Sequence, residues 1–175
     1  MRSSKPFTNE YYTKRVDHDG GRHREARAER EPAECEHCGA LLINRRWTRR
    51  PGASSMATTE RWRPPHMVLC PACRQEVAGL PRGFVTITGT FTEEHLDEIR
   101  RLLRNEALRA ADDNPMARIT HWEYDPVKGL SVATTTEHLA QRLGHALEKA
   151  YGGEVHYGFS HENKFTRVDW WRDSA

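Results

Sequence analysis

Two Cys-x-x-Cys pairs constrain this chain more than any other feature of its sequence. Cys35 and Cys38 form the first pair, Cys70 and Cys73 form the second, and these are all 4 of its cysteines. Four thiolates arranged in two such pairs match the tetrahedral ligand set of a structural zinc ion. Because the protein would fill every position, none is left for a water molecule, and a catalytic zinc is disfavoured. We therefore expect a single structural zinc ion per chain.

Other uses of the four cysteines stay open at this point. An iron–sulfur cluster also takes four thiolates, and the cysteines could carry no metal at all. A redox Cys-x-x-Cys needs only one pair, at a helix N-terminus beside a strand, so two matched pairs argue against it. His37 and His66 lie next to the pairs and could replace a ligand, but four cysteines already complete the set.

The overall composition indicates a protein of the cytoplasm. No apolar run approaches the roughly 20 residues needed to span a bilayer, so no membrane association is expected. The first ten residues lack the apolar segment of a secretory signal. In the reducing cytoplasm, the four cysteines are not expected to form disulfides.

Charge is distributed unevenly along the chain. Residues 1–83 contain 16 Lys and Arg against 10 Asp and Glu, whereas residues 84–175 contain 11 against 15. The first half therefore carries a net charge of +6 and the second half −4. A basic half suggests a polyanionic partner. Charge alone does not separate a nucleic acid from a phospholipid surface.

The basic charge is concentrated between the cysteine pairs, where six arginines and two tryptophans are interleaved with Glu60 as the only acid. Arginine pairs with phosphates and stacks on bases, and tryptophan also stacks on bases. This pattern favours contact with RNA, in single-stranded or irregular regions, over a solvated loop whose tryptophans cover a small metal core. The candidate RNA-binding residues are Arg45, Arg46, Trp47, Arg49, Arg50, Arg61, Trp62 and Arg63.

Three regions follow from these patterns. Residues 1–33 are crowded with charge and too poor in apolar side chains to fold alone, so we expect a tail that is disordered or ordered by a partner. Residues 34–82 form a zinc ribbon with the arginine and tryptophan loop. Residues 83–175 show the regular hydrophobic periods of an α/β domain.

The α/β domain has a readable order of elements. Val85 and Ile87 alternate with threonines, as in a half-buried strand, and Leu96, Ile99 and Leu103 then recur at helical spacing. Asp112-Asp113-Asn114-Pro115 should end that helix. Two short strands are expected at about 118–124 and 129–135, followed by a capping box at Thr134-x-x-Glu137, a helix and two more strands. This order predicts an α+β, ferredoxin-like β-α-β-β-α-β domain with one further terminal strand.

No enzyme motif is recognisable. The chain contains no Gly-x-Ser-x-Gly elbow, no Walker-type phosphate loop and no Gly-x-Gly-x-x-Gly. The first long helix places Asp97 four residues before Arg101, which is typical of an exposed, ion-paired face. We therefore expect a protein that is not an enzyme and has no small-molecule substrate.

Several stretches resemble a known family. The run Thr134-Thr135-Thr136-Glu137-His138-Leu139-Ala140 and the later Ala150-Tyr151-Gly152-Gly153-Glu154 are similar to the adaptor of large-ribosomal-subunit export, a nonsense-mediated-decay adaptor family, and to its archaeal relatives. Short bacterial zinc-ribbon proteins also resemble the chain over roughly residues 34–172. The resemblance implies association with the ribosome or its RNA, in assembly or in the hibernation of idle ribosomes.

The sequence thus supports two hypotheses. In the first, the protein is a ribosome-associated factor that binds ribosomal RNA through the loop between the cysteine pairs. In the second, the zinc ribbon is a scaffold for protein interaction or regulation, and the loop contacts an acidic protein. Steep salt dependence of binding would favour the first, since it reports counterion release from a nucleic acid.

Overall fold

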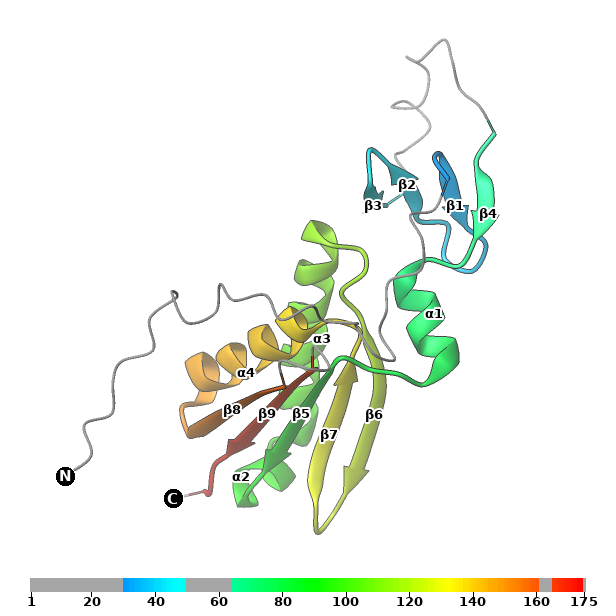
Figure 1. The fold of residues 1–175 in the computed structure, drawn as a ribbon. Coiled ribbons are helices and arrows are strands. Elements are labelled where there is room, and N and C mark those ends of the chain that lie inside the picture. The colour runs from blue at the N-terminus through cyan, green and yellow to red at the C-terminus, as the bar shows by residue number, and fades with distance from the viewer. Residues whose placement is uncertain (1–29, 50–63, 161–164, 175) are drawn as a thin grey trace, which may run out of the picture.

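The chain folds into two units, a small module around the cysteines and a larger α/β domain (Figure 1). The computed structural model describes residues 30–49, 64–160 and 165–174. The module has four short strands and one helix: β1 (Ala33–Cys35), β2 (Leu41–Ile43), β3 (Arg46–Thr48), β4 (His66–Val68) and α1 (Pro71–Ala78). The domain has five strands and three helices: β5 (Gly83–Thr88), α2 (Thr90–Glu94), α3 (Leu96–Asp113), β6 (Ile119–Asp125), β7 (Gly129–Thr134), α4 (Glu137–Tyr151), β8 (Glu154–Ser160) and β9 (Phe165–Trp171).

The module is a four-stranded sheet in the order β3-β2-β1-β4, with β1 parallel to β4 and antiparallel to β2. β2 and β3 form a hairpin whose two turn residues, Asn44 and Arg45, have φ angles of 52° and 61°. Positive φ at both positions is the geometry of a type I′ turn, which matches the twist of the flanking strands. The backbone N–H of Arg45 donates to Glu31 Oε1 at 2.7 Å, which helps to hold this turn.

The α+β class is confirmed, and the α/β domain has the expected order of elements except for the short helix α2, which the sequence did not predict. Its strands are arranged β6-β7-β5-β9-β8, and β9 runs parallel to β5. The sheet does not show the ferredoxin-like order, because the terminal strand β9 takes the place beside β5 and leaves β8 at the edge. Burial explains the difference: Val168 and Trp170 of β9 are fully buried, as expected of a central strand, whereas β8 has no fully buried residue.

α3 and α4 pack together on one face of this sheet (Figure 1). Leucines at helical spacing, such as Leu103 on α3 and Leu143 on α4, are fully buried against Val85 and Val168 of the central strands. The N-cap of α4 lies two residues later than the sequence prediction placed it. Its N-cap is Thr136, whose side chain accepts a hydrogen bond from the Leu139 N–H at 3.2 Å, so Thr134 is not the capping residue.

Within residues 30–49, 64–160 and 165–174, no helix has the length and apolar character needed to cross a membrane. The tail predicted over residues 1–33 lies almost entirely outside the described residues, which begin at Arg30. Its last residue, Ala33, already belongs to β1 and is completely buried.

Candidate metal centre

The two cysteine pairs are presented by different local structures. Cys35 ends β1 and Cys38 lies in the turn that follows, where Gly39 takes a φ of 70°, a left-handed conformation that favours glycine. The Gly39 N–H donates to the Cys35 carbonyl oxygen at 2.8 Å and closes the turn. The second pair opens a helix: Cys70 is the N-cap of α1, and Cys73 lies in its first turn. The structure therefore contains one knuckle and one helix N-terminus in place of the two knuckles of the sequence prediction.

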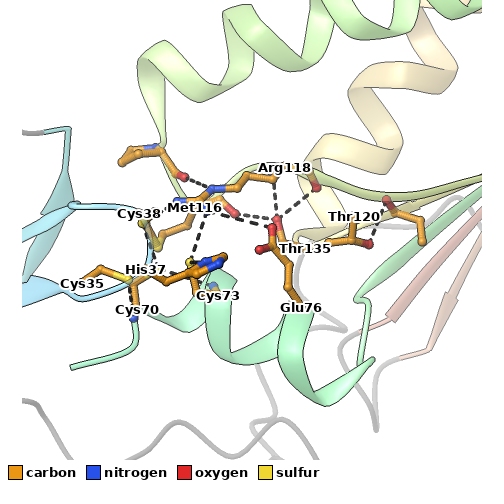
Figure 2. Close-up of polar contacts among 12 residues, drawn as sticks. Cys35, His37, Cys38, Cys70, Cys73, Glu76, Met116, Arg118, Thr120 and Thr135 are labelled. Carbon is orange, nitrogen blue, oxygen red and sulfur yellow. Dashed lines mark hydrogen bonds and ion pairs between the residues drawn. The ribbon is translucent and has the colours of Figure 1, made fainter.

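The four sulfur atoms converge on one point (Figure 2). All four lie within 4.8 Å of one another, and the Cys38 and Cys70 sulfurs are 3.7 Å apart. A tetrahedral zinc with Zn–S bonds of about 2.3 Å separates its sulfurs by about 3.8 Å. All four cysteines are free, and three are buried while Cys38 is exposed. The cluster therefore fits a metal site with four thiolate ligands.

Backbone amides already favour negative charge in this cluster. The N–H groups of Cys70 and Cys73 point at the sulfurs of Cys35 and Cys70, at 3.3 and 3.4 Å. Burial raises the pKa of Cys35, but hydrogen bonds from the backbone of Cys70, Cys38 and His37 outweigh it and lower the pKa to about 6. Burial raises the pKa of Cys70 and raises the pKa of Cys73 to about 11. Four adjacent sulfurs cannot all ionise unaided, and a bound cation removes that conflict.

A redox role for the Cys70–Cys73 pair is supported by its position at a helix N-terminus and opposed by the pKa values of its thiols. Cys70-x-x-Cys73 does lie at a helix N-terminus after a strand, which is the setting of a redox pair. A redox-active pair, however, needs a thiol with a lowered pKa, and in this pair the pKa of both thiols is raised. The other pair also completes the same four-sulfur cluster, so metal binding accounts for all four residues together.

Sequence reasoning missed Arg118, which lies between α3 and β6 in the α/β domain. Its Nη2 donates to Cys38 Sγ at 3.0 Å and its Nη1 to Cys73 Sγ at 3.4 Å (Figure 2). Burial lowers the pKa of Arg118, but the hydrogen bonds to the two sulfurs outweigh it and raise the pKa above its usual range. No local pattern marks this residue, since 45 positions separate it from Cys73.

A second group of possible ligands lies beside the cluster. His37, Cys73 and Glu76 also bring their ligand atoms within 4.8 Å of one another. The guanidinium of Arg118 lies 3.4 Å from Cys73 Sγ and 4.0 Å from Glu76 Oε1. This positive charge beside two of the three groups disfavours the binding of another cation there. His37 Nδ1, at 3.4 Å from Cys73 Sγ, is a hydrogen-bond neighbour of the sulfur.

The residues predicted to bind RNA separate into distinct groups. Arg45 is exposed at the β2–β3 turn, and Arg46 is exposed at the start of β3. Trp47 is partly buried and packs against the cysteine cluster, so this ring covers the small core of the module. The remaining predicted residues of this loop beyond Arg49, namely Arg50, Arg61, Trp62 and Arg63, lie outside the described residues.

Two of these arginines reach the C-terminal end of α3. Arg49 Nη1 lies 3.0 Å from Asp112 Oδ1, and Arg46 Nη2 donates to the Asp113 carbonyl oxygen at 3.4 Å. Carbonyl groups and acidic side chains at a helix C-terminus form a negative end that attracts cations. Arg49, Arg118 and Cys38 border a cavity of about 550 Å³ at this junction. The metal module and the α/β domain are therefore joined by polar contacts around the cluster.

Comparison with known proteins adds no further identification. No family model matches the chain, and neither a curated protein nor a solved structure does.

Proposed function

We propose that this protein is a non-enzymatic RNA-binding factor of the cytoplasm that associates with ribosomes, and that its cluster holds one structural zinc ion. Zinc is favoured because it accepts four thiolates in a tetrahedron and needs no open position. Bound there, zinc would supply folding free energy and no chemistry at a substrate. Elemental analysis of the purified chain should find one zinc per chain, whereas iron would overturn this assignment.

One observation carries the RNA proposal. The sulfur cluster supports a hairpin that projects two adjacent exposed arginines, Arg45 and Arg46. Arg45 takes a left-handed backbone conformation that non-glycine residues seldom adopt, and such positions cluster at functional sites. Two arginines on one hairpin offer guanidinium groups that suit phosphate oxygens, although Arg46 also donates to the Asp113 carbonyl oxygen, and the net charge of +6 over residues 1–83 supports a polyanionic partner.

Association with the ribosome rests on the sequence resemblance stated above. In the structure, two residues of the run 134–140 that carries the resemblance have a structural role, which does not depend on the identity of a binding partner. Thr135 and Thr136 in that stretch fix the Arg118 segment and the start of α4. Ribosomal RNA is the polyanion that both the resemblance and the exposed arginines support, and the role would be in assembly or in silencing.

Sedimentation and salt titration test this proposal. The chain should co-sediment with ribosomes, and the double variant Arg45→Ala with Arg46→Ala should lose most of that association. In binding to a ribosomal RNA fragment, this variant should lower the slope of log K against log salt by about one unit per lost phosphate contact. Arg101→Ala with Arg109→Ala removes the same charge from the exposed side of α3 and should leave the slope unchanged.

Two results would reject RNA binding. One is a wild-type affinity that barely changes with salt, since phosphate contacts release counterions. The other is equal sedimentation of the hairpin variant and the α3 variant.

A specific contact favours a second candidate, a module that binds an acidic protein. Arg49 already pairs with the Asp112 carboxylate at 3.0 Å, so the arginines of this edge do accept carboxylate partners. A shallow salt dependence together with retained binding to an acidic protein would select this alternative.

A further inference from the structure

Arg118 is held in position by its own domain. Its Nε donates to the Pro115 carbonyl oxygen at 3.0 Å, and its backbone N–H donates to Thr135 Oγ1 at 2.8 Å. Thr135 is 1% exposed, and its hydroxyl donates to the Met116 carbonyl oxygen at 2.5 Å. These contacts connect the segment between α3 and β6 to the end of β7. The orientation of the guanidinium is therefore fixed by contacts within the α/β domain, independently of the sulfurs.

The guanidinium contacts one sulfur from each cysteine pair. Cys38 belongs to the knuckle after β1, and Cys73 belongs to the first turn of α1 (Figure 2). A planar fork with parallel N–H groups can hold two acceptors at once, which a lysine ammonium cannot do in the same geometry. Cys38 is the one exposed ligand, so the shorter contact, at 3.0 Å, covers the sulfur that solvent and reagents can reach.

Charge makes these contacts strong when the metal is present. Four thiolates and one divalent ion leave a net charge of about −2 on the centre, because each ligand must be deprotonated. A guanidinium cation offsets part of this charge through two charge-assisted hydrogen bonds. Partners of this kind orient metal ligands and tune the metal, and losing one typically costs about 10–100-fold in metal affinity.

The other contacts across the junction are weaker. The Arg49–Asp112 pair is exposed, with 57% and 69% of the two side chains accessible, so solvent screens it. The Arg118–Glu76 pair is long, at 4.0 Å. Met116 adds apolar packing against the cysteine cluster. The exposed Arg46 also donates to the Asp113 carbonyl oxygen, at 3.4 Å. Among the described residues, the two sulfur contacts of Arg118 are therefore the strongest polar contacts between the module and the domain.

We propose that Arg118 is a positioning residue for the metal centre and that, through it, the bound metal locks the cysteine module onto the α/β domain. The metal would then act at two levels: it folds the module, and it sets the orientation in which the module's hairpin is presented. This inference rests on the proposed metal site but does not depend on RNA binding.

The test compares the full-length chain with Arg118→Met and with Arg101→Met, a matched loss of charge at an exposed position of α3. All three should contain one zinc. Arg118→Met should release zinc to a chelator about 10–100-fold faster. Its cobalt-substituted form should show a thiolate-to-metal absorption band shifted to lower energy, because the sulfurs lose hydrogen bonds. Cys38 should also react faster with iodoacetamide.

Nuclear relaxation measures the joint itself. In the wild type, residues 33–49 and 64–78 of the module and residues 83–160 and 165–172 of the domain should tumble with one correlation time. In Arg118→Met the module should tumble faster than the domain. Arg118→Lys keeps the charge without the fork, so its zinc release should lie between the other two rates. It also serves as the test variant if Arg118→Met does not fold.

The outcomes separate the two proposals. If the wild-type chain contains no metal, the proposed zinc site is wrong and the role of Arg118 falls with it. If the wild type contains zinc but the Arg118 variants match Arg101→Met in release rate, cobalt spectrum and tumbling, only the role of Arg118 is overturned.

Discussion

The two units of this protein are stabilised in opposite ways. Among the described residues, the buried cluster of the α/β domain contains 15 residues, nearly all large and apolar, whereas that of the module contains 5, and three of those are cysteines. Units of fewer than about 70 residues rarely gain enough stability from a single apolar core and commonly add a metal or disulfides. The comparison shows that the domain is held by packing and the module by its sulfurs and whatever they bind.

The largest effect should come from a single ligand. We expect Cys73→Ser to unfold the module and leave the domain folded, because structural zinc contributes apparent binding free energies of about 10–16 kcal/mol in small zinc-dependent units. Amide NMR spectra should lose the dispersed signals of residues 33–49 and 64–78 and keep those of residues 83–160 and 165–172. Elemental analysis should find no zinc.

His66→Ala is the control for this variant, since His66 lies on β4 beside the cluster but is exposed and is not one of the four ligands. It should keep both zinc and fold. If the module of Cys73→Ser kept dispersed amide signals without metal, packing alone would hold the module. The contrast between a packed domain and a metal-dependent module would then be wrong.

A substitution in the core of the α/β domain should destabilise the domain and leave the module intact, with a smaller loss of free energy than Cys73→Ser causes in the module. Leu143 on α4 is completely buried between the helices and the sheet. Leu143→Ala should lower the free energy of unfolding of the domain by about 2–5 kcal/mol, from lost burial and the cavity left behind. Urea unfolding followed by helical circular dichroism measures this change, and the zinc content should not alter.

Leu108→Ala is the matched control, because Leu108 lies on α3 with 63% of its surface exposed. Its unfolding free energy should change by less than about 0.5 kcal/mol. Equal destabilisation by both variants, or loss of zinc from Leu143→Ala, would mean that the two units do not have separate cores.

The same contrast explains what could be predicted from sequence. In the domain, burial imposes a period on the chain, so the alternation of β5 and the helical spacing of Leu103 and its neighbours identify the elements locally. The stop at Asp112-Asp113-Asn114-Pro115 was also correct, since α3 ends at Asp113. The place of β9 was not predictable in this way, because β8 and β9 both alternate, and which of them pairs with β5 is settled by the whole sheet.

In the module, chemistry and spacing identified the four cysteines, and the structure brings them together. The sequence could not reveal that an arginine distant in the chain donates hydrogen bonds to two of the cysteine sulfurs. Arg118 contacts Cys38 across 80 positions, and its own neighbours give no sign of a sulfur partner. The segment that carries Arg118 is held by the Thr135 hydroxyl, just after β7, and by the Pro115 carbonyl oxygen, and neither contact can be read from local sequence.

The smallest effect concerns charge within the domain, at Glu106 on α3. Burial raises the pKa of this carboxyl, but hydrogen bonds and charge from Arg142 and Arg109 outweigh it and hold the pKa below its usual range. A folded-state pKa below the unfolded value, about 4.3, stabilises the protein above that pH. This stabilisation is lost as the pH falls through the folded-state pKa.

We therefore expect Glu106→Gln to lower the free energy of unfolding of the domain slightly at pH 7, as measured by urea unfolding. The change should be less than about 1 kcal/mol, because Arg109 is largely exposed. The difference from the wild type should disappear at a pH below the folded-state pKa of Glu106. Glu148→Gln, an exposed carboxylate on α4, should show no such difference at either pH. If the destabilisation by Glu106→Gln grew as the pH fell, its sign would be opposite to the prediction. The ion pairs of Glu106 would then not stabilise the domain. In the domain, charge thus adjusts a fold that packing already determines, whereas in the module we expect folding to depend on the metal that the four sulfurs bind.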